Sequence, residues 1–185
     1  MAVQKDVVVL VGSLRETSIS GKVARTLQAL SPAGIRLETT EIRHLSFYNQ
    51  DLETGTPPSG WTAFRDRIRA CDAVLFVTPE YNRSIPAALK NALDVGSRPY
   101  GKSVWNAKPS AVVSASPGLL GGAAAALHLR QVLTGVNMRA LPQPEVYLSG
   151  ADRLFDEFGA LANEGTKGFL ESFLRAFEVW IGEFD

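Results

Sequence analysis

The chain has 185 residues, of which 45% are hydrophobic, 21% charged and 9% aromatic. This composition is typical of a soluble, folded domain, and it excludes collagen, a disordered tail and a small disulfide-bonded scaffold. Nineteen basic residues balance nineteen acidic ones, so no overall field attracts nucleic acid or an anionic membrane surface, and any anion site is local.

Apolar strands alternate with amphipathic helices in the first part of the chain. Residues 7–11 form a β-branched run, which predicts a strand buried on both faces. Ser18 and Ser20 then offer N-cap hydroxyls to a helix that ends before Ser31-Pro32. Residues 35–42 predict a second, more exposed strand, and the polar stretch that follows it is a loop.

The same alternation continues to the end of the chain. Further expected elements are a helix at 61–68, a strand at 72–77, a helix at 85–93, a strand at 110–114, a helix at 121–133 and a strand between 136 and 148. The final helix carries an aromatic stripe that predicts core packing, formed by Phe169, Phe173, Phe177, Trp180 and Phe184.

Five strands, each followed by a helix, predict an α/β fold with a parallel sheet covered by helices on both faces. No linker or internal repeat divides the chain, so we expect one domain over residues 1–185. In such a sheet a ligand binds beyond the carboxyl ends of the strands. This places the candidate site in three loops, at residues 12–20, 78–84 and 114–122.

The first of these loops has the chemistry of a phosphate site. It lacks the G-x-G-x-x-G pattern of dinucleotide folds but offers the hydroxyls of Ser13, Ser18 and Ser20, the guanidinium of Arg15 and the amides of a helix N-terminus. These groups predict a site for a phosphate monoester that needs no metal. The alternative is that the serines only cap the helix and that Arg15 is a solvated charge.

The second and third loops suit a flat ring that lies close to the backbone. Two prolines stiffen residues 78–86 around Tyr81 and Asn82, which favours a heteroaromatic ligand, although an ordinary turn before a helix is the alternative. Small residues in the loop at 114–122 allow close approach to the main chain.

Three ordered motifs carry a family resemblance: GSLRETSISGKVAR at 12–25, TPEYNRSIPAALKNALD at 78–94 and SASPGLLGG at 114–122. The chain resembles the NADPH-dependent FMN reductase family, near its bacterial quinone and chromate reductase branch, up to about residue 147. Two positions depart from the branch: Ser20 is often asparagine there, and Val95 replaces a tryptophan after Asp94.

The resemblance implies a flavodoxin-like three-layer α/β/α fold with strand order 2-1-3-4-5, and it implies FMN as the cofactor. It assigns the cofactor to Ser13, Arg15, Ser18, Ser20, Pro79, Glu80, Tyr81, Asn82, Ser116 and Gly118. Tyr81 and Asn82 would line the ring, and main-chain amides at 80–82 would stabilise charge on it. No catalytic protein residue is expected, because the flavin carries the chemistry.

The expected activity is ping-pong hydride transfer through flavin N5, from NADPH or NADH to a quinone, with chromate and other metal oxyanions as further acceptors. Arg83 is a candidate contact for the 2′-phosphate of NADPH. The alternatives are a flavodoxin-type electron carrier, disfavoured by the balanced charge, and a regulatory protein with a vestigial flavin site.

The resemblance also implies a homodimer or homotetramer, with Arg130 and Glu145 as a candidate interface pair. We expect a structural or interface hydrogen bond from His128 rather than a catalytic role. Cys71 is the only cysteine, so we expect no disulfide, no metal site and a reducing cytoplasm. The amino-terminal apolar run is too short for a targeting or membrane segment.

One further motif is rejected on its context. Residues 96–103 match the P-loop pattern letter by letter, but they follow a helix, whereas a phosphate cradle follows a buried strand.

Overall fold

The computed structural model describes residues 4–184, so residues 1–3 and 185 of the expected domain lie outside the described part. A parallel sheet in the order β2-β1-β3-β4-β5 forms its centre, with β6 also paired to β4. This order confirms the predicted flavodoxin-like arrangement. The strands are β1 Lys5–Val11, β2 Ile35–Thr39, β3 Ala73–Thr78, β4 Pro109–Ala115, β5 Arg139–Ala140 and β6 Val146–Leu148.

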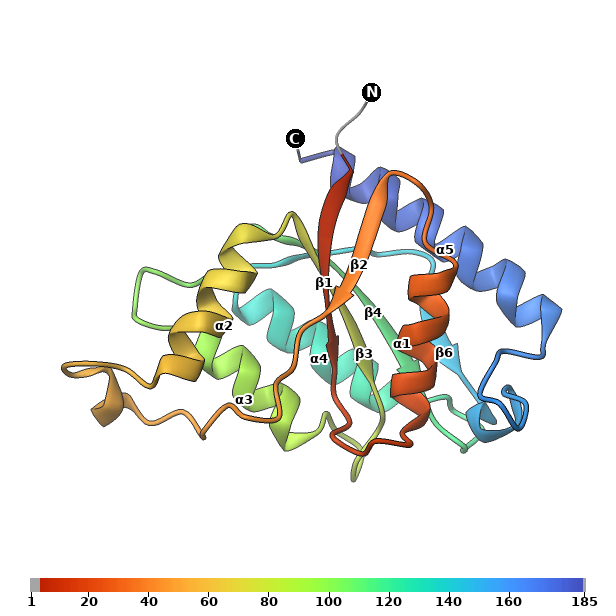
Figure 1. Ribbon diagram of the computed structural model, residues 1–185, viewed down its shortest axis with the longest axis horizontal. Helices are drawn as coiled ribbons and strands as arrows, with labels where there is room; N and C mark the ends of the chain where they lie inside the picture. Colours follow the sequence, from red (N-terminus) through yellow and green to blue (C-terminus); the bar gives the residue numbers. More distant parts are fainter. Residues whose placement is uncertain (1–3, 185) are drawn as a thin grey trace.

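Helices cover both faces of this sheet, as right-handed crossovers require. Figure 1 shows α1 and α5 on one face, and α2, α3 and α4 on the other. The helices are α1 Ile19–Ala29, α2 Ser59–Ala70, α3 Ala87–Gly96, α4 Ala123–Gly135 and α5 Glu164–Gly182, with short 3-10 turns η1 Gln50–Glu53 and η2 Ala151–Arg153.

The period of two along β1 explains why the predicted strand has no polar side. Val7 and Val9 pack into the core under α1 and α5, whereas Val8 and Leu10 pack into the core under α2, α3 and α4. All four side chains are fully buried. The β-branched run therefore contributes to both hydrophobic layers.

The last predicted strand is divided in two. Both β5 and β6 pair with β4, one at each end, and the segment between them contains Pro142 and Pro144. Proline has no amide hydrogen to donate to a sheet ladder, which explains the interruption.

The two most central aromatic residues of the predicted α5 stripe, Phe173 and Phe177, are buried. Phe169 remains 40% exposed at the start of the helix, so the stripe is only partly core.

The remaining sequence expectations concern membranes, metals and the P-loop pattern. Residues 4–184 contain no helix that is both long and apolar enough to cross a membrane. Within the same range, no three His, Cys, Asp or Glu side chains gather into a group that could hold a metal ion. Residues 96–103 begin at the last residue of α3 and continue into turns, so no strand precedes them. A phosphate cradle would need a strand there, which agrees with the rejection of this motif.

Candidate functional site

The carboxyl ends of β1, β3 and β4 bring the three predicted loops to one edge of the sheet. The Gly12 amide donates to the Val77 carbonyl at 2.9 Å, which joins the first loop to the strand before the second. A Cβ atom on Gly12 would lie 3.2 Å from Pro79 and 3.3 Å from Pro86. A side chain here would crowd both prolines, so glycine favours the close packing of the first two loops.

A cavity of about 170 Å³ lies between these loops. Eight of the ten predicted cofactor residues line it: Ser13, Arg15, Ser18, Ser20, Pro79, Glu80, Tyr81 and Ser116. Asn82 and Gly118 do not. Gly118 instead donates its amide to Ser116 Oγ at 3.1 Å, within its own loop.

Sequence reasoning missed four residues that also line the cavity, namely Thr17, Ile19, Ala115 and Pro117. Thr17 could have been found from the sequence, because its hydroxyl belongs to the same loop as the three serines. The other three offer no side-chain polar group, so they carried no signal for a phosphate site.

The serines of the first loop have different roles. Ser18 is the N-cap of α1, and its Oγ accepts from the Gly21 amide at 3.0 Å. Ser20, also expected as an N-cap candidate, lies inside the first turn, where its hydroxyl is buried and has no hydrogen-bond partner within the described residues. Ser13 Oγ lies 3.2 Å from the Tyr81 hydroxyl, so these two groups connect the first and second loops.

The second loop is a tight hairpin. Tyr81 and Ser84 exchange backbone hydrogen bonds of 2.9 and 3.0 Å, and Asn82 and Arg83 between them have φ values of 51° and 65°. Two consecutive left-handed residues inside such a pair correspond to a type I′ turn, which asparagine tolerates and arginine adopts at a cost of about 1 kcal/mol. The Tyr81 amide therefore already donates to the Ser84 carbonyl. Three amides, at residues 80–82, were expected to face the ring, and among them only those of Glu80 and Asn82 lack a partner in the described chain.

The Glu80 side chain connects the second loop to the third. Its Oε2 accepts from the amides of Ala124 and Ala125 at 3.1 and 3.3 Å, which lie in the first turn of α4. The N-cap residue of this helix is Gly122, which has no side chain to cap it. Glu80 thus caps α4 from a different loop and also benefits from the positive end of the helix dipole.

The polar groups of the cavity fit the phosphate of FMN. A buried hydroxyl without a partner carries an energetic cost that a phosphate oxygen would remove, and Ser20 is 1% exposed. Arg15 forms no ion pair within the described residues, and the first turn of α1 leaves amides without intrahelical acceptors. The cavity therefore offers a hydroxyl, a guanidinium and helix amides to one dianion.

The remaining candidates lie outside this cavity. His128 Nδ1 lies 3.0 Å from Ser84 Oγ, in a groove of about 660 Å³ between α3 and α4. Arg130 and Glu145 approach to 3.6 Å within one chain. Arg83 is largely exposed, 4.0 Å from Glu80.

Comparisons with known proteins agree on one family. The sequence model of the NADPH-dependent FMN reductase family matches residues 6–153. A quinone reductase of Pseudomonas putida KT2440 is 53% identical, covering 95% of this chain and 94% of that protein. A 2-hydroxy-1,4-benzoquinone reductase of a Burkholderia species is 38% identical, covering 95% of both. The structure of FerB, a flavoenzyme NAD(P)H:(acceptor) oxidoreductase from Paracoccus denitrificans, superposes with a TM-score of 0.90 at 39% identity, covering 97% of this chain and 98% of that one.

Proposed function

This chain belongs to the NADPH-dependent FMN reductase family, and from that premise we propose that it reduces quinones with electrons from NAD(P)H through bound FMN. The observation that carries the cofactor assignment is the buried, unpartnered hydroxyl of Ser20 in the cavity beside the α1 N-terminus. The quinone assignment draws on the relatives named as quinone reductases.

Ser13, Arg15, Ser18 and Ser20 would hold the phosphate. Arg15 supplies the positive charge and Ser20 the free hydroxyl, whereas the Ser18 hydroxyl already accepts a bond and has its own hydrogen left to donate. Because Ser18 fixes the first turn of α1, the helix amides keep their direction whether or not a ligand is present.

The second and third loops would hold the ring, through Pro79, Glu80, Tyr81, Asn82, Ser116 and Gly118. When bound, FMN would take hydride from NAD(P)H at N5 and pass it to the acceptor in a separate half-reaction. The free amides of Glu80 and Asn82 would face developing negative charge on the ring. The Tyr81 hairpin keeps this stretch of backbone rigid, so little reorganisation is needed.

Three finer points belong to the same proposal. Chromate and other metal oxyanions are further acceptors, because a flavin edge is chemically unselective. A homodimer or homotetramer is expected, and the exposed Leu127 beside the α3–α4 groove supports it. The expected location is the cytoplasm, where the lone Cys71 stays reduced.

The first experiment is the visible spectrum of the purified protein, followed by anaerobic addition of NADPH and then of quinone. Yellow absorbance that bleaches quickly and returns with quinone is the expected result. Absorbance that resists NADPH but bleaches with dithionite would instead indicate an electron carrier. A colourless protein that takes up no added FMN would overturn the cofactor assignment.

A further inference from the structure

A second pocket lies on the other side of the first loop. It occupies about 310 Å³ between α1, the loop after β1 and the segment that follows β2. Ser13, Arg15 and Ser18 border both this pocket and the cavity assigned to the FMN phosphate, whereas Arg25 and Arg43 line only the second. The second pocket therefore has two arginines of its own that the proposed FMN site does not use.

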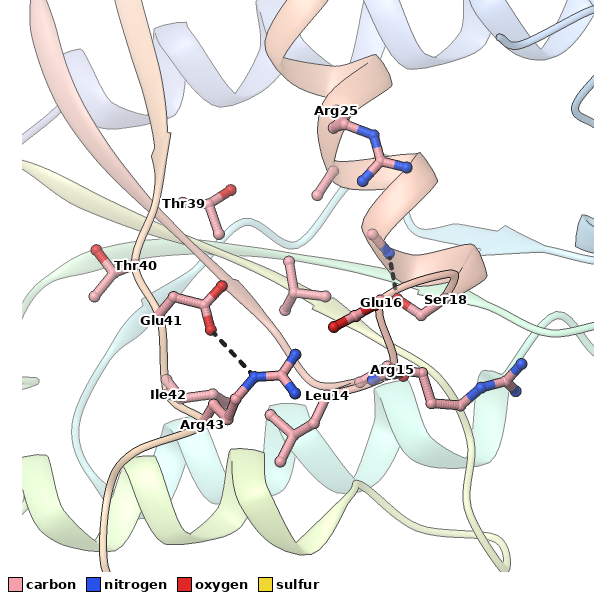
Figure 2. A pocket seen from close by; sticks show the side chains of 14 residues that line it. Leu14, Arg15, Glu16, Ser18, Arg25, Thr39, Thr40, Glu41, Ile42 and Arg43 are labelled. Carbon is pink, nitrogen blue, oxygen red and sulfur yellow. Dashed lines mark hydrogen bonds and ion pairs between the residues drawn. The ribbon is translucent and has the colours of Figure 1, made fainter. Parts of the chain in front are cut away.

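Two arginines from different elements face this pocket. Figure 2 shows Arg25 on α1 and Arg43 on the segment after β2, on different sides of the pocket, whereas Arg15 extends away from both. Arg25 has no ion pair or hydrogen bond within residues 4–184. Arg43 has only a 3.9 Å contact with Glu41, and both of these side chains are substantially exposed. Such a pair contributes little, so an incoming anion can replace Glu41 at low cost.

The other polar groups suit a sugar phosphate. Thr39 and Thr40 add hydroxyl donors to the pocket lining, and the carboxylate of Glu16 can accept from ribose hydroxyls. Three arginines and two glutamates line the pocket, so its formal charge is positive by one. This balance favours an anionic group attached to a polyol over a free cation or an apolar ring.

Only one substrate of the proposed reaction carries a phosphate monoester. NADPH has it at the adenosine 2′ position, where NADH has a hydroxyl, and quinones have none. In doubly wound dinucleotide folds an arginine near the second strand accommodates this 2′-phosphate. Arg43 follows β2, so it occupies a comparable place in this sheet although the glycine-rich fingerprint is absent.

We propose that this pocket binds the 2′-phosphate of NADPH, with Arg25 and Arg43 as its ligands, and that it gives the enzyme a preference for NADPH over NADH. The inference rests on the proposed function. Arg25 and Arg43 replace Arg83 as the candidate contacts of the 2′-phosphate. Arg83 lies on the hairpin beside Glu80 and does not line this pocket, where Arg25 and Arg43 are both available to the same phosphate.

Steady-state kinetics of FMN-loaded variants with each nucleotide test this. Arg25→Ala and Arg43→Ala should each raise the KM for NADPH roughly tenfold, as loss of a charge-assisted hydrogen bond does, with little change in kcat or in the KM for NADH. Glu41→Gln should act in the opposite direction and lower the KM for NADPH, a result that general damage to the fold would not give. Arg36→Ala is the control, since Arg36 is an arginine on β2 that does not line the pocket.

A binding measurement provides a second readout. Adenosine 2′-monophosphate, titrated calorimetrically into the holoenzyme, should bind, and should bind more weakly to both arginine variants than to Arg36→Ala. Inorganic phosphate that binds as tightly as the nucleotide would overturn the proposal, as would unchanged nucleotide selectivity in both variants or a loss of selectivity in Arg83→Ala alone. Failure of the proposed function is distinguishable, because then neither NADPH nor NADH would reduce the wild-type flavin.

Discussion

Two serines that are equivalent in the sequence have opposite energetic roles. Ser18 Oγ satisfies the Gly21 amide, whereas the hydroxyl of Ser20, two residues later, is buried with no partner in the described chain. An unmade buried hydrogen bond costs about 1 to 3 kcal/mol, which the apoprotein retains until a ligand supplies the partner. Stability and cofactor binding should therefore respond differently at these two positions.

We predict that Ser20→Ala stabilises the apoprotein by about 0.5 to 1 kcal/mol, because it removes an unsatisfied hydroxyl and alanine favours the helix. The same change should weaken FMN binding roughly tenfold, because a hydrogen bond to the phosphate is lost. Urea unfolding of the apoprotein and fluorescence titration with FMN measure the two effects. In contrast, Ser18→Ala should destabilise the apoprotein by about 1 kcal/mol. Tighter FMN binding by Ser20→Ala would contradict the assignment.

Cys71 shows how burial controls a titrating group outside the site. Burial raises the pKa of the Cys71 thiol above its ordinary value of 9.0, and the nearby Lys108 opposes this only in part. Its Sγ donates to the Ile68 carbonyl at 3.2 Å. The folded protein therefore holds the thiol proton more tightly than the unfolded chain does, and the thiol is unreactive near neutral pH.

The sign of the resulting pH dependence follows from linkage. Because the folded pKa is raised, the stabilisation is complete below pH 9 and declines as the pH rises through the folded value. Urea unfolding of wild type and Cys71→Ala should therefore give a difference in unfolding free energy that shrinks above pH 9. A difference that grows with pH, or rapid labelling of the native thiol by iodoacetamide at pH 7, would refute this.

At the scale of elements, the site depends on one helix capped by another loop. Gly122 has a φ of 83° and no side chain, so α4 cannot cap itself there. Glu80 provides the acceptors and at the same time anchors the hairpin at 81–84, whose turn has two left-handed residues. The position of the backbone at residues 80–82, which we propose holds the flavin ring, is thus tied to the N-terminus of α4.

We predict that Glu80→Ala destabilises the protein by about 1 to 2 kcal/mol, the usual cost of a lost N-cap. Hydrogen exchange at the amides of Ala124 and Ala125 should accelerate, and FMN should bind more weakly because the hairpin loses its anchor. Glu80→Gln, which keeps an acceptor, should lose less on each measure. Glu157→Ala removes an exposed carboxylate elsewhere and serves as the control. Unchanged exchange in Glu80→Ala would show that the helix does not depend on this cap.

At the scale of the whole molecule, the surface over α3 and α4 combines an exposed leucine with a groove. Leu127 projects from α4 with 57% of its surface exposed, so it does not belong to the core beneath this helix. Leu129 and Leu133 fill that core instead. The neighbouring groove contains His128 and Gln131 at its rim, which suits a contact with a second copy of the chain.

If this surface forms the expected dimer or tetramer, Leu127→Arg should lower the molar mass measured by light scattering at micromolar concentration. Two buried arginines facing each other would cost several kcal/mol, enough to separate most subunits. Val179→Arg on α5, where the side chain is 65% exposed, is the control and should leave the mass unchanged. A wild-type protein that is monomeric would refute the expectation directly.

The order of strands and helices and the chemistry of the three loops were predictable from the sequence alone. Apolar periodicity, N-cap serines and turn prolines act over a few residues, so their local pattern is sufficient to identify them. The right-handed crossover rule then places residues 12–20, 78–84 and 114–122 at one edge of the sheet. For this reason eight of the ten cofactor residues that the family resemblance implies line one cavity.

Only the tertiary structure decided how each polar group is used. It showed that Ser18 is already bonded and Ser20 free, that Glu80 caps a helix 44 residues further along the chain, and that Arg25 and Arg43 share a pocket. These facts depend on the packing of segments that are distant in sequence. The local pattern of residues does not show which of two neighbouring hydroxyls will be buried against such distant segments, because burial is a property of the assembled core.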